Sequence, residues 1–253
     1  GVVSFWTAYL KANYPTEYMA ALLTSVRDDK DKSALYLSEC RRMGIKVIPP
    51  DVNESDAEYT PRGKDIRFGL AAIRNVGEGV VASVKASRES KGAFASFSDF
   101  LAKVDANVCN KKTIESLIKA GAFDSLGHPR RGLLMVFESI VDAAITKRRE
   151  RDQGIMSLFD SVDSDAPGPD VEIAIPEMEF DKSERLRVEK EMLGLYISDH
   201  PLSGIESALR RRVEMSIADA VERNDGDIIT VGGIVTGFAR KFTKRGDQMG
   251  VFV

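Results

Sequence analysis

Two glycines two positions apart mark the segment of this sequence that is best suited to binding a ligand. Gly77 and Gly79 lie in Ile73-Arg-Asn-Val-Gly-Glu-Gly-Val-Val-Ala-Ser-Val84, between a short apolar lead-in and an amphipathic helical pattern. Glycine can adopt a positive φ and lets a partner approach the backbone closely, while the first N–H groups of a helix beginning near Gly79 attract an anion. This pattern is typical of a helix-hairpin-helix motif, and the natural anion for it is a DNA phosphate.

A second segment looks similar: Asn110-Lys-Lys-Thr-Ile-Glu-Ser-Leu-Ile-Lys-Ala-Gly-Ala-Phe-Asp124. Because phosphate contacts fix the position of a duplex without reading its bases, the tandem predicts DNA affinity without sequence specificity. The candidate DNA-binding residues are Asn75, Gly77, Gly79 and Lys85 in the first hairpin and Lys111, Lys112, Lys119 and Gly121 in the second.

Either hairpin has a competing interpretation as pure scaffold. The common hairpin pattern has a glycine where Asn75 stands, which leaves the turn geometry open. In the second segment the apolar residues around the glycine are suited to a core. Those residues are Leu117, Ile118, Ala122 and Phe123.

Charge is unevenly distributed along the chain, although the net charge is only -3. Residues 107–151 carry nine lysines and arginines against five acids, whereas residues 160–181 carry eight acids and no basic residue. A basic segment followed by an acidic segment is typical of a phosphate-binding surface followed by a solvated connector. Solvated helix faces and an acidic loop explain the same pattern equally well.

Composition excludes several classes of protein. The 253 residues are 43% hydrophobic and 30% charged, as in a globular protein of one large domain or a few small ones. No apolar run is long enough for a membrane span and no secretory signal is visible, so we expect a cytoplasmic protein without a membrane partner. The two cysteines, Cys40 and Cys109, are far apart and both histidines precede proline, so we expect reduced thiols and no metal site.

Hydrophobic periodicity predicts a mainly helical chain. Helices are expected from about Phe5, at 16–26, from Asp31 to the glycine at 44, around Phe97–Val104, at 110–121, at 133–151, at 177–196 and at 201–212. A short strand is expected at 45–48, a polar loop at 51–61, and a strand or a hairpin lead-in at 67–70. After a composition shift at 225–227 we expect strands at 228–238 and 248–253 around a basic turn, as in a small truncated β-barrel. The first helix has no cap before it, as in a fragment.

One short peptide combines an apolar tip with charged, flexible flanks. It is Gln153-Gly-Ile-Met-Ser-Leu-Phe159, directly before a Pro/Gly/Ser-rich linker at 160–176. Exposed Leu158 and Phe159 are costly without a partner, so the peptide is a candidate linear binding motif. The alternative is that its apolar residues pack back on the preceding helix.

Four segments together carry a family resemblance. They are Thr7-Ala-Tyr-Leu-Lys-Ala-Asn-Tyr-Pro15, Met43-Gly-Ile-Lys-Val-Ile-Pro-Pro-Asp-Val-Asn53, Leu117-Ile-Lys-Ala-Gly-Ala-Phe-Asp-Ser-Leu126 and Glu189-Lys-Glu-Met-Leu-Gly-Leu-Tyr-Ile-Ser-Asp-His-Pro-Leu202. In this order they resemble the alpha subunit of bacterial DNA polymerase III, a C-family replicative polymerase. The resemblance implies four regions: the end of a fingers domain at 1–44, a tandem helix-hairpin-helix domain at 45–145, a region with clamp-binding peptide, acidic linker and helical connector at 146–226, and a truncated OB-fold at 227–253.

The resemblance also implies partners and sites. Residues 153–159 resemble a sliding-clamp motif of the form Gln-x-x-Leu-x-Leu-Phe, with Met156 in place of the first Leu. In such a motif Gln153 binds the rim of the clamp pocket, and Met156, Leu158 and Phe159 fill the pocket. The basic residues of the OB-fold are candidates for contact with single-stranded DNA, with Phe238 and Phe242 either stacking on bases or lying in the core. These basic residues are Arg240, Lys241, Lys244 and Arg245. Other replicase subunits are further implied partners.

No residue of this chain is predicted to be catalytic. The family implies Mg²⁺ held by palm aspartates, which lie outside this sequence. Asp163-Ser-Asp165 has a suitable spacing for two-metal chemistry but lies in the linker, and Asp225-Gly-Asp227 is typical of a turn. The expected function is therefore to grip duplex DNA and tether the polymerase to its clamp. The alternatives are a non-catalytic helix-hairpin-helix scaffold of a repair protein and an error-prone polymerase paralogue.

Overall fold

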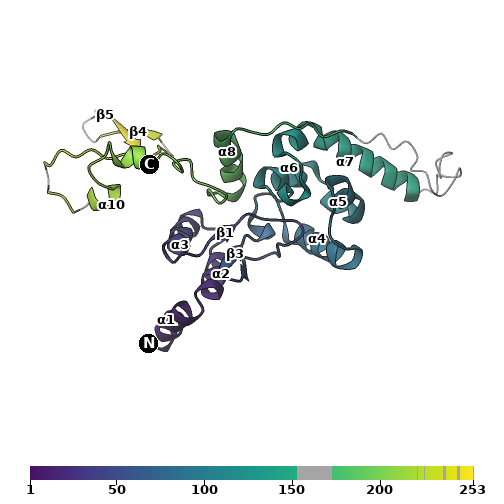
Figure 1. The fold of residues 1–253 in the computed structure, drawn as a ribbon, viewed down its shortest axis with the longest axis horizontal. Coiled ribbons are helices and arrows are strands. Elements are labelled where there is room, and N and C mark those ends of the chain that lie inside the picture. Colours follow the sequence, from purple (N-terminus) through teal and green to yellow (C-terminus); the bar gives the residue numbers. More distant parts are fainter. Residues whose placement is uncertain (153–172, 221, 225, 236–237, 244–245, 253) are drawn as a thin grey trace. The chain divides into compact units, whose positions relative to one another are not determined.

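The computed structural model describes residues 1–152 and 173–252, apart from residues 221, 225, 236, 237, 244 and 245 (Figure 1). The chain forms two compact units, Gly1–Asp199 and His200–Val253. The hairpins and the helices that position them all lie in the first unit.

Three helices open the first unit: α1 (Val2–Asn13), α2 (Pro15–Ser25) and α3 (Lys30–Arg42). Pro15 begins α2, where its missing N–H leaves no hydrogen bond unmade. The Asp29 side chain accepts the N–H of Lys32 and caps α3. Gly44 follows α3 and has a φ of 74°, in agreement with the prediction that this glycine ends the helix.

A small three-stranded sheet follows in the order β1 (Val47–Ile48), β3 (Asp65–Arg67) and β2 (Thr60–Arg62). β1 pairs with β3 in parallel, and β2 pairs with β3 antiparallel. The central residue Ile66 is fully buried. β2 lies in the segment that we expected to be a loop, because three residues with a proline carry too little pattern to reveal a strand.

The helix-hairpin-helix part of the first unit contains short 3₁₀ turns between α-helices. Its elements are η1 (Leu70–Ala72), α4 (Glu78–Lys91), α5 (Phe97–Lys103), η2 (Ala106–Val108), α6 (Lys111–Ala120), η3 (Asp124–Leu126) and α7 (Arg130–Asp152). α8 (Lys182–Leu193) follows and is shorter than predicted. Within the described chain no helix has the length and apolarity needed to cross a membrane.

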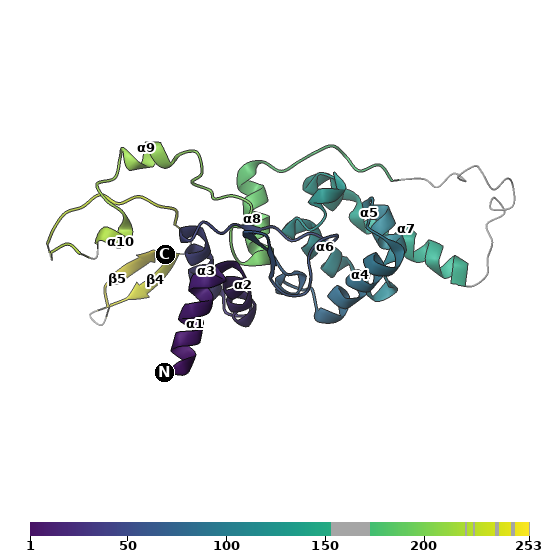
Figure 2. The same cartoon turned by 60° about the horizontal axis from the view of Figure 1, so that its bottom comes forward.

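One hydrophobic core runs through the first unit from α2 to α8. α6 packs against both α7 and α8, as Figure 2 shows. Phe100 lies edge-on to Phe123 with ring centroids 4.9 Å apart, and Phe97 lies edge-on to Phe123 at 5.2 Å. Because Met19 of α2 and Met192 of α8 belong to the same core, the expected boundaries at 44 and 145 fall inside one compact unit. The assignment of four functional domains stays a prediction.

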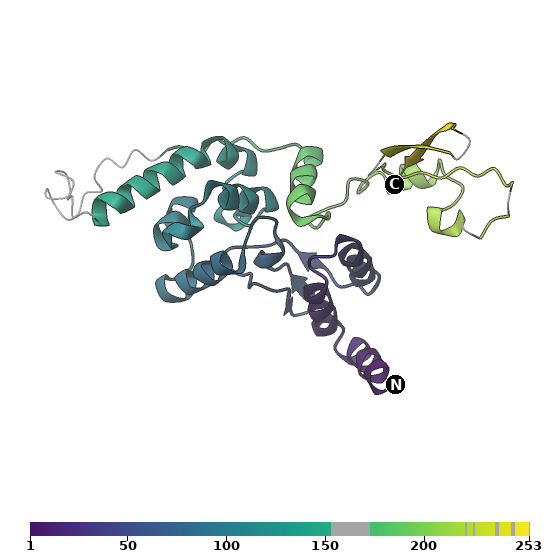
Figure 3. The same ribbon diagram turned by 180° about the vertical axis from the view of Figure 1, so that it is seen from behind.

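The second unit contains α9 (Glu206–Arg210), α10 (Ile217–Ala220) and an antiparallel pair, β4 (Phe238–Phe242) and β5 (Gln248–Phe252), visible in Figure 3. The strand expected at 228–238 is wrong, since residues 228–235 are irregular. Gly232 and Gly233 weaken a strand there, and Thr230 is hydrogen-bonded to Glu214 instead. Arg240 and Lys241 consequently lie in β4 rather than in a turn. The mainly helical class is confirmed, and no closed barrel is present among the described residues.

Candidate nucleic-acid interface

The first predicted hairpin is a tight turn between η1 and α4. Its start is fixed by α8, because the N–H of Arg74 donates to the carbonyl of Met192 at 3.1 Å. Asn75 follows with a φ of 65°. This left-handed conformation favours glycine, and asparagine is among the side chains that tolerate it best. Asn75 therefore preserves the backbone geometry that a glycine usually supplies at this position.

Asn75 also joins the first hairpin to the second motif. Its Nδ2 donates to Ser116 Oγ at 3.0 Å, and its carbonyl accepts a hydrogen bond from Thr113 Oγ1 at 3.2 Å. Ser116 and Thr113 are buried side chains of α6. The first turn is thus held against α6, and the two motifs form one connected surface.

The N-terminus of α4 is open beside this turn. Gly77 is its N-cap with a φ of -82°, so the positive φ that we expected of the glycines falls on Asn75 instead. A methyl group at Gly77 or Gly79 would meet no atom within 4 Å. In the described part of the chain, the N–H groups of Gly77, Glu78 and Gly79 have no acceptor. The backbone here is accessible to a partner, as the sequence pattern predicts.

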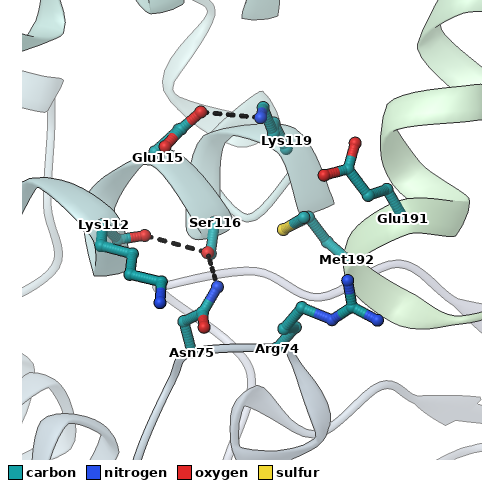
Figure 4. A pocket seen from close by; sticks show the side chains of 8 residues that line it. All are labelled: Arg74, Asn75, Lys112, Glu115, Ser116, Lys119, Glu191 and Met192. Atoms are coloured by element: carbon teal, nitrogen blue, oxygen red, sulfur yellow. Dashed lines mark hydrogen bonds and ion pairs between the residues drawn. The ribbon is translucent and has the colours of Figure 1, made fainter.

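A pocket of about 390 Å³ lies next to the same turn (Figure 4). Its lining comes from the turn, α6 and α8: Arg74, Asn75, Lys112, Glu115, Ser116, Lys119, Glu191 and Met192. The structure brings together Asn75, Lys112 and Lys119, which were predicted from two separate motifs. It adds Arg74, which sequence reasoning missed although this arginine directly precedes Asn75.

The cations of this pocket differ in their partners. The Lys119 ammonium is 2.7 Å from the Glu115 carboxylate. Arg74 and Lys112 are exposed, and neither makes an ion pair with another described residue. Glu191 also lines the pocket, but no carboxylate of the described residues lies within ion-pair distance of Arg74 or Lys112, so these two side chains are the better candidates for binding an anion.

Two predicted DNA-binding lysines contact acids of the protein itself. The Lys85 ammonium is 2.9 Å from Asp56, and the Lys111 ammonium is 2.8 Å from Asp142 and 3.5 Å from Glu138. The hydrogen bond to Asp142 raises the pKa of Lys111. A phosphate at either lysine competes with these carboxylates, so their DNA contacts stay predictions with weaker structural support.

The structure gives Gly121 a packing role. Its φ of 82° ends α6 in the left-handed conformation, and a methyl group there would collide with the guanidinium of Arg130. Gly121 is buried. Glycine is therefore favoured at this position whether or not the second hairpin contacts DNA.

The remaining predicted sites fall at the chain's second unit or outside the described residues. Arg240 and Lys241 are exposed on β4, as are Phe238 and Phe242, so neither phenylalanine lies in a core. Lys244 and Arg245 are outside the described residues. So is the entire candidate clamp peptide, with Gln153, Met156, Leu158 and Phe159.

Comparison with known proteins supports the hairpin assignment. Residues 44–133 match the family model described as a helix-hairpin-helix motif. DNA polymerase III subunit alpha from Mycobacterium tuberculosis (strain ATCC 25618 / H37Rv) is 50% identical over 97% of this chain, and its counterpart from Saccharopolyspora erythraea is 51% identical over 97%. The chain is homologous to one region of DNA polymerase III subunit alpha.

The homology also extends to more distant bacteria, since DNA polymerase III subunit alpha from Thermus aquaticus is 38% identical over 99% of the chain. The chain spans 21% of the Mycobacterium tuberculosis relative and 20% of the Thermus aquaticus relative. It thus corresponds to about a fifth of a DNA polymerase III subunit alpha, and the predicted resemblance is confirmed.

We expect Asn75→Ala to destabilise the protein more than Asn75→Gly. Both variants lose the hydrogen bond to Ser116, but only alanine must adopt the left-handed conformation, which costs about 1–2 kcal/mol. The glycine variant has a more flexible unfolded chain, which offsets part of this cost. We therefore expect the free energies of unfolding of the two variants to differ by about 1 kcal/mol. Urea unfolding followed by circular dichroism measures it. Equal stability of the two variants would contradict the assigned backbone conformation.

Proposed function

We propose that this chain is the part of a replicative DNA polymerase that grips the duplex. The observation that carries the proposal is the open surface at the first turn. It combines accessible N–H groups at Gly77–Gly79 with the unpaired cations of Arg74 and Lys112. Backbone N–H groups at a helix N-terminus and basic side chains are the usual ligands of DNA phosphates.

The chemistry of this surface suits a protein that moves along DNA. Phosphate contacts are independent of base sequence, so the same surface can bind each new stretch of product duplex. Packing within the described chain does not explain why residues 77 and 79 are glycines, since a methyl group at either would meet no atom. Close approach of a phosphate to the backbone does explain it. Binding of this kind is driven by the release of counterions and weakens steeply with salt.

The names of the relatives support the wider assignment. We infer that the whole protein is a cytoplasmic DNA-directed DNA polymerase that assembles with other replicase subunits. Its nucleotidyl transfer requires Mg²⁺ held by carboxylates outside this chain, so we assign no catalytic residue here. The C-terminal unit then contributes strands of an OB-fold that binds single-stranded DNA through Arg240, Lys241, Lys244 and Arg245.

Duplex binding should depend on the pocket cations. We expect Arg74→Ala/Lys112→Ala to reduce the salt dependence of duplex affinity, lowering the slope of log K against log salt by about 1–2 because up to two phosphate contacts are lost. Fluorescence anisotropy with a labelled primed duplex at several salt concentrations measures the slope. Lys64→Ala is the matched control, because Lys64 is an exposed lysine in the turn between β2 and β3. An unchanged slope in the double variant would remove these residues from the interface.

The proposed phosphate contact with the backbone at Gly77–Gly79 can be tested by a glycine substitution. Gly79→Ala adds a methyl group that meets no atom of the free protein, so folding stability should be kept while duplex affinity falls. Full affinity in a stably folded Gly79→Ala protein would show that no phosphate approaches this position.

Single-strand binding should depend on the exposed basic residues of β4. Arg240→Ala/Lys241→Ala is expected to weaken binding of a labelled single-stranded oligonucleotide several-fold at low salt, through lost phosphate contacts. Duplex binding by the same variant serves as the control. Undiminished single-strand affinity would refute this assignment.

We further propose that residues 153–159 bind the sliding clamp. The support is the sequence itself: Gln153 has the position of the rim contact, and Met156, Leu158 and Phe159 have those of the pocket anchors. An apolar tip followed by an acidic linker is suited to reaching a separate partner.

Clamp binding can be measured by pull-down of the wild-type chain with purified sliding clamp. Leu158→Ala/Phe159→Ala should abolish most of the retention, since buried apolar anchors usually dominate the affinity of such peptides. Equal retention of clamp by the double variant would reject the tether.

A further inference from the structure

The N-terminus of α7, in the second hairpin, is covered by a segment that contains the last residues of the expected linker and the residues directly after it. We call residues 173–181 the strap. The carboxylate of Glu179 accepts the N–H of Arg130 at 3.0 Å and that of Arg131 at 3.4 Å. The carbonyl of Met178 accepts the next N–H, from Gly132, at 2.8 Å. Three consecutive N–H groups at the start of α7 are therefore occupied by the strap.

The strap lies directly against the backbone of α7. A methyl group at Gly132 would collide with the carbonyl oxygen of Pro176, so only glycine permits this approach. Ile173 and Ile175 of the strap pack against the hydrophobic core. Apolar burial and hydrogen bonds to the backbone thus hold the strap on the second hairpin.

The basic side chain at this helix start also faces inward. Arg130 is 3% exposed, and its guanidinium binds Asp124 at 2.6 and 2.8 Å. It also donates to the Lys119 carbonyl at 3.3 Å and lies 3.5 Å from Glu189, which is fully buried. Arg130 is consequently committed to internal partners and is not available to a phosphate.

The two hairpins therefore differ at the position where such motifs bind phosphate. At α4 the N–H groups of Gly77–Gly79 are open, whereas at α7 those of Arg130–Gly132 are taken by the strap. The strap also carries Glu177, Glu179 and Asp181, whose charges repel a phosphate.

We propose that the strap closes the α7 start of the second hairpin to DNA, with the Glu179 carboxylate occupying the place of a phosphate, so that the duplex is gripped at the first turn and the neighbouring Lys112 of α6. This inference rests on the proposed function in taking DNA as the ligand of the first hairpin. The second hairpin instead anchors the strap and thereby fixes the path of the chain between the linker and α8.

Charge reversal at matched arginines tests the proposal in the intact chain. Arg74 and Arg131 are both exposed and each flanks one hairpin turn. At about 0.15 M salt, where charges more than roughly 8 Å apart are largely screened, Arg74→Glu should weaken duplex binding on the order of tenfold and Arg131→Glu less than twofold. A loss with Arg131→Glu comparable to that with Arg74→Glu would overturn the closure of the second hairpin.

Amide chemical shifts provide an independent measurement. In ¹⁵N-labelled wild-type protein, added duplex should shift the N–H signals of Glu78 and Gly79 and leave those of Arg130, Arg131 and Gly132 in place. Displacement of the Arg130–Gly132 signals would show that DNA replaces the strap, against the proposal. If neither Arg74→Glu nor Arg131→Glu weakens binding and the Arg130–Gly132 signals stay in place, the first-hairpin assignment fails while the closure of the second hairpin stands.

Discussion

The first unit depends on the pairing of one buried charge. Burial works to lower the pKa of the Arg130 guanidinium, but hydrogen bonding to Asp124 and the charges of Asp124 and Glu189 outweigh it and raise the pKa. A buried cation requires such partners, because an unpaired charge in the interior is strongly destabilising. Arg130 thereby joins the end of α6, the turn of the second hairpin and α8 around a single side chain. Glu189 completes the arrangement, since its other oxygen accepts the N–H groups of Ile197 and Ser198 at 2.8 Å.

The two hairpins differ in whether their charged side chains and helix N–H groups are paired within the protein. Around the second hairpin, the Arg130 guanidinium is paired with Asp124 and Glu189, and the first N–H groups of α7 are bonded to Glu179 and Met178. Around the first hairpin, Asn75 bonds to α6 and leaves the α4 N-terminus and the cations of Arg74 and Lys112 unsatisfied. Polar groups that a protein does not satisfy internally are available for a partner. The homology to DNA polymerase III subunit alpha is consistent with DNA being that partner.

Most of the helical architecture could be predicted from local sequence. Pro15, Ser96 and Asn110 mark helix starts, and Gly121 marks a helix end, because caps act on N–H and C=O groups within one turn. The third helix was expected from Asp31, whereas its cap is Asp29. The failures lie where local signals are weak. β2 has only three residues, and the expected strand at 228–238 is interrupted by glycines. The site was found in part: the glycine pattern located the first turn, whereas Arg74 carried no motif of its own.

The sequence by itself determined most of the helices, the position of the first hairpin and the resemblance to DNA polymerase III subunit alpha, because these depend on short-range pattern or on long matching strings. The tertiary structure decided which basic residues are free. Lys85 meets Asp56, Lys111 meets Asp142, and Arg130 meets Glu189, while Lys112 meets no acid among the described residues. Charged side chains select partners by distance in space, and in a chain that is 30% charged many pairings are equally compatible with the sequence. The packing of α6, α7 and α8 selects the partners of Lys111 and Arg130, and the packing of α4 against the segment before β2 selects that of Lys85.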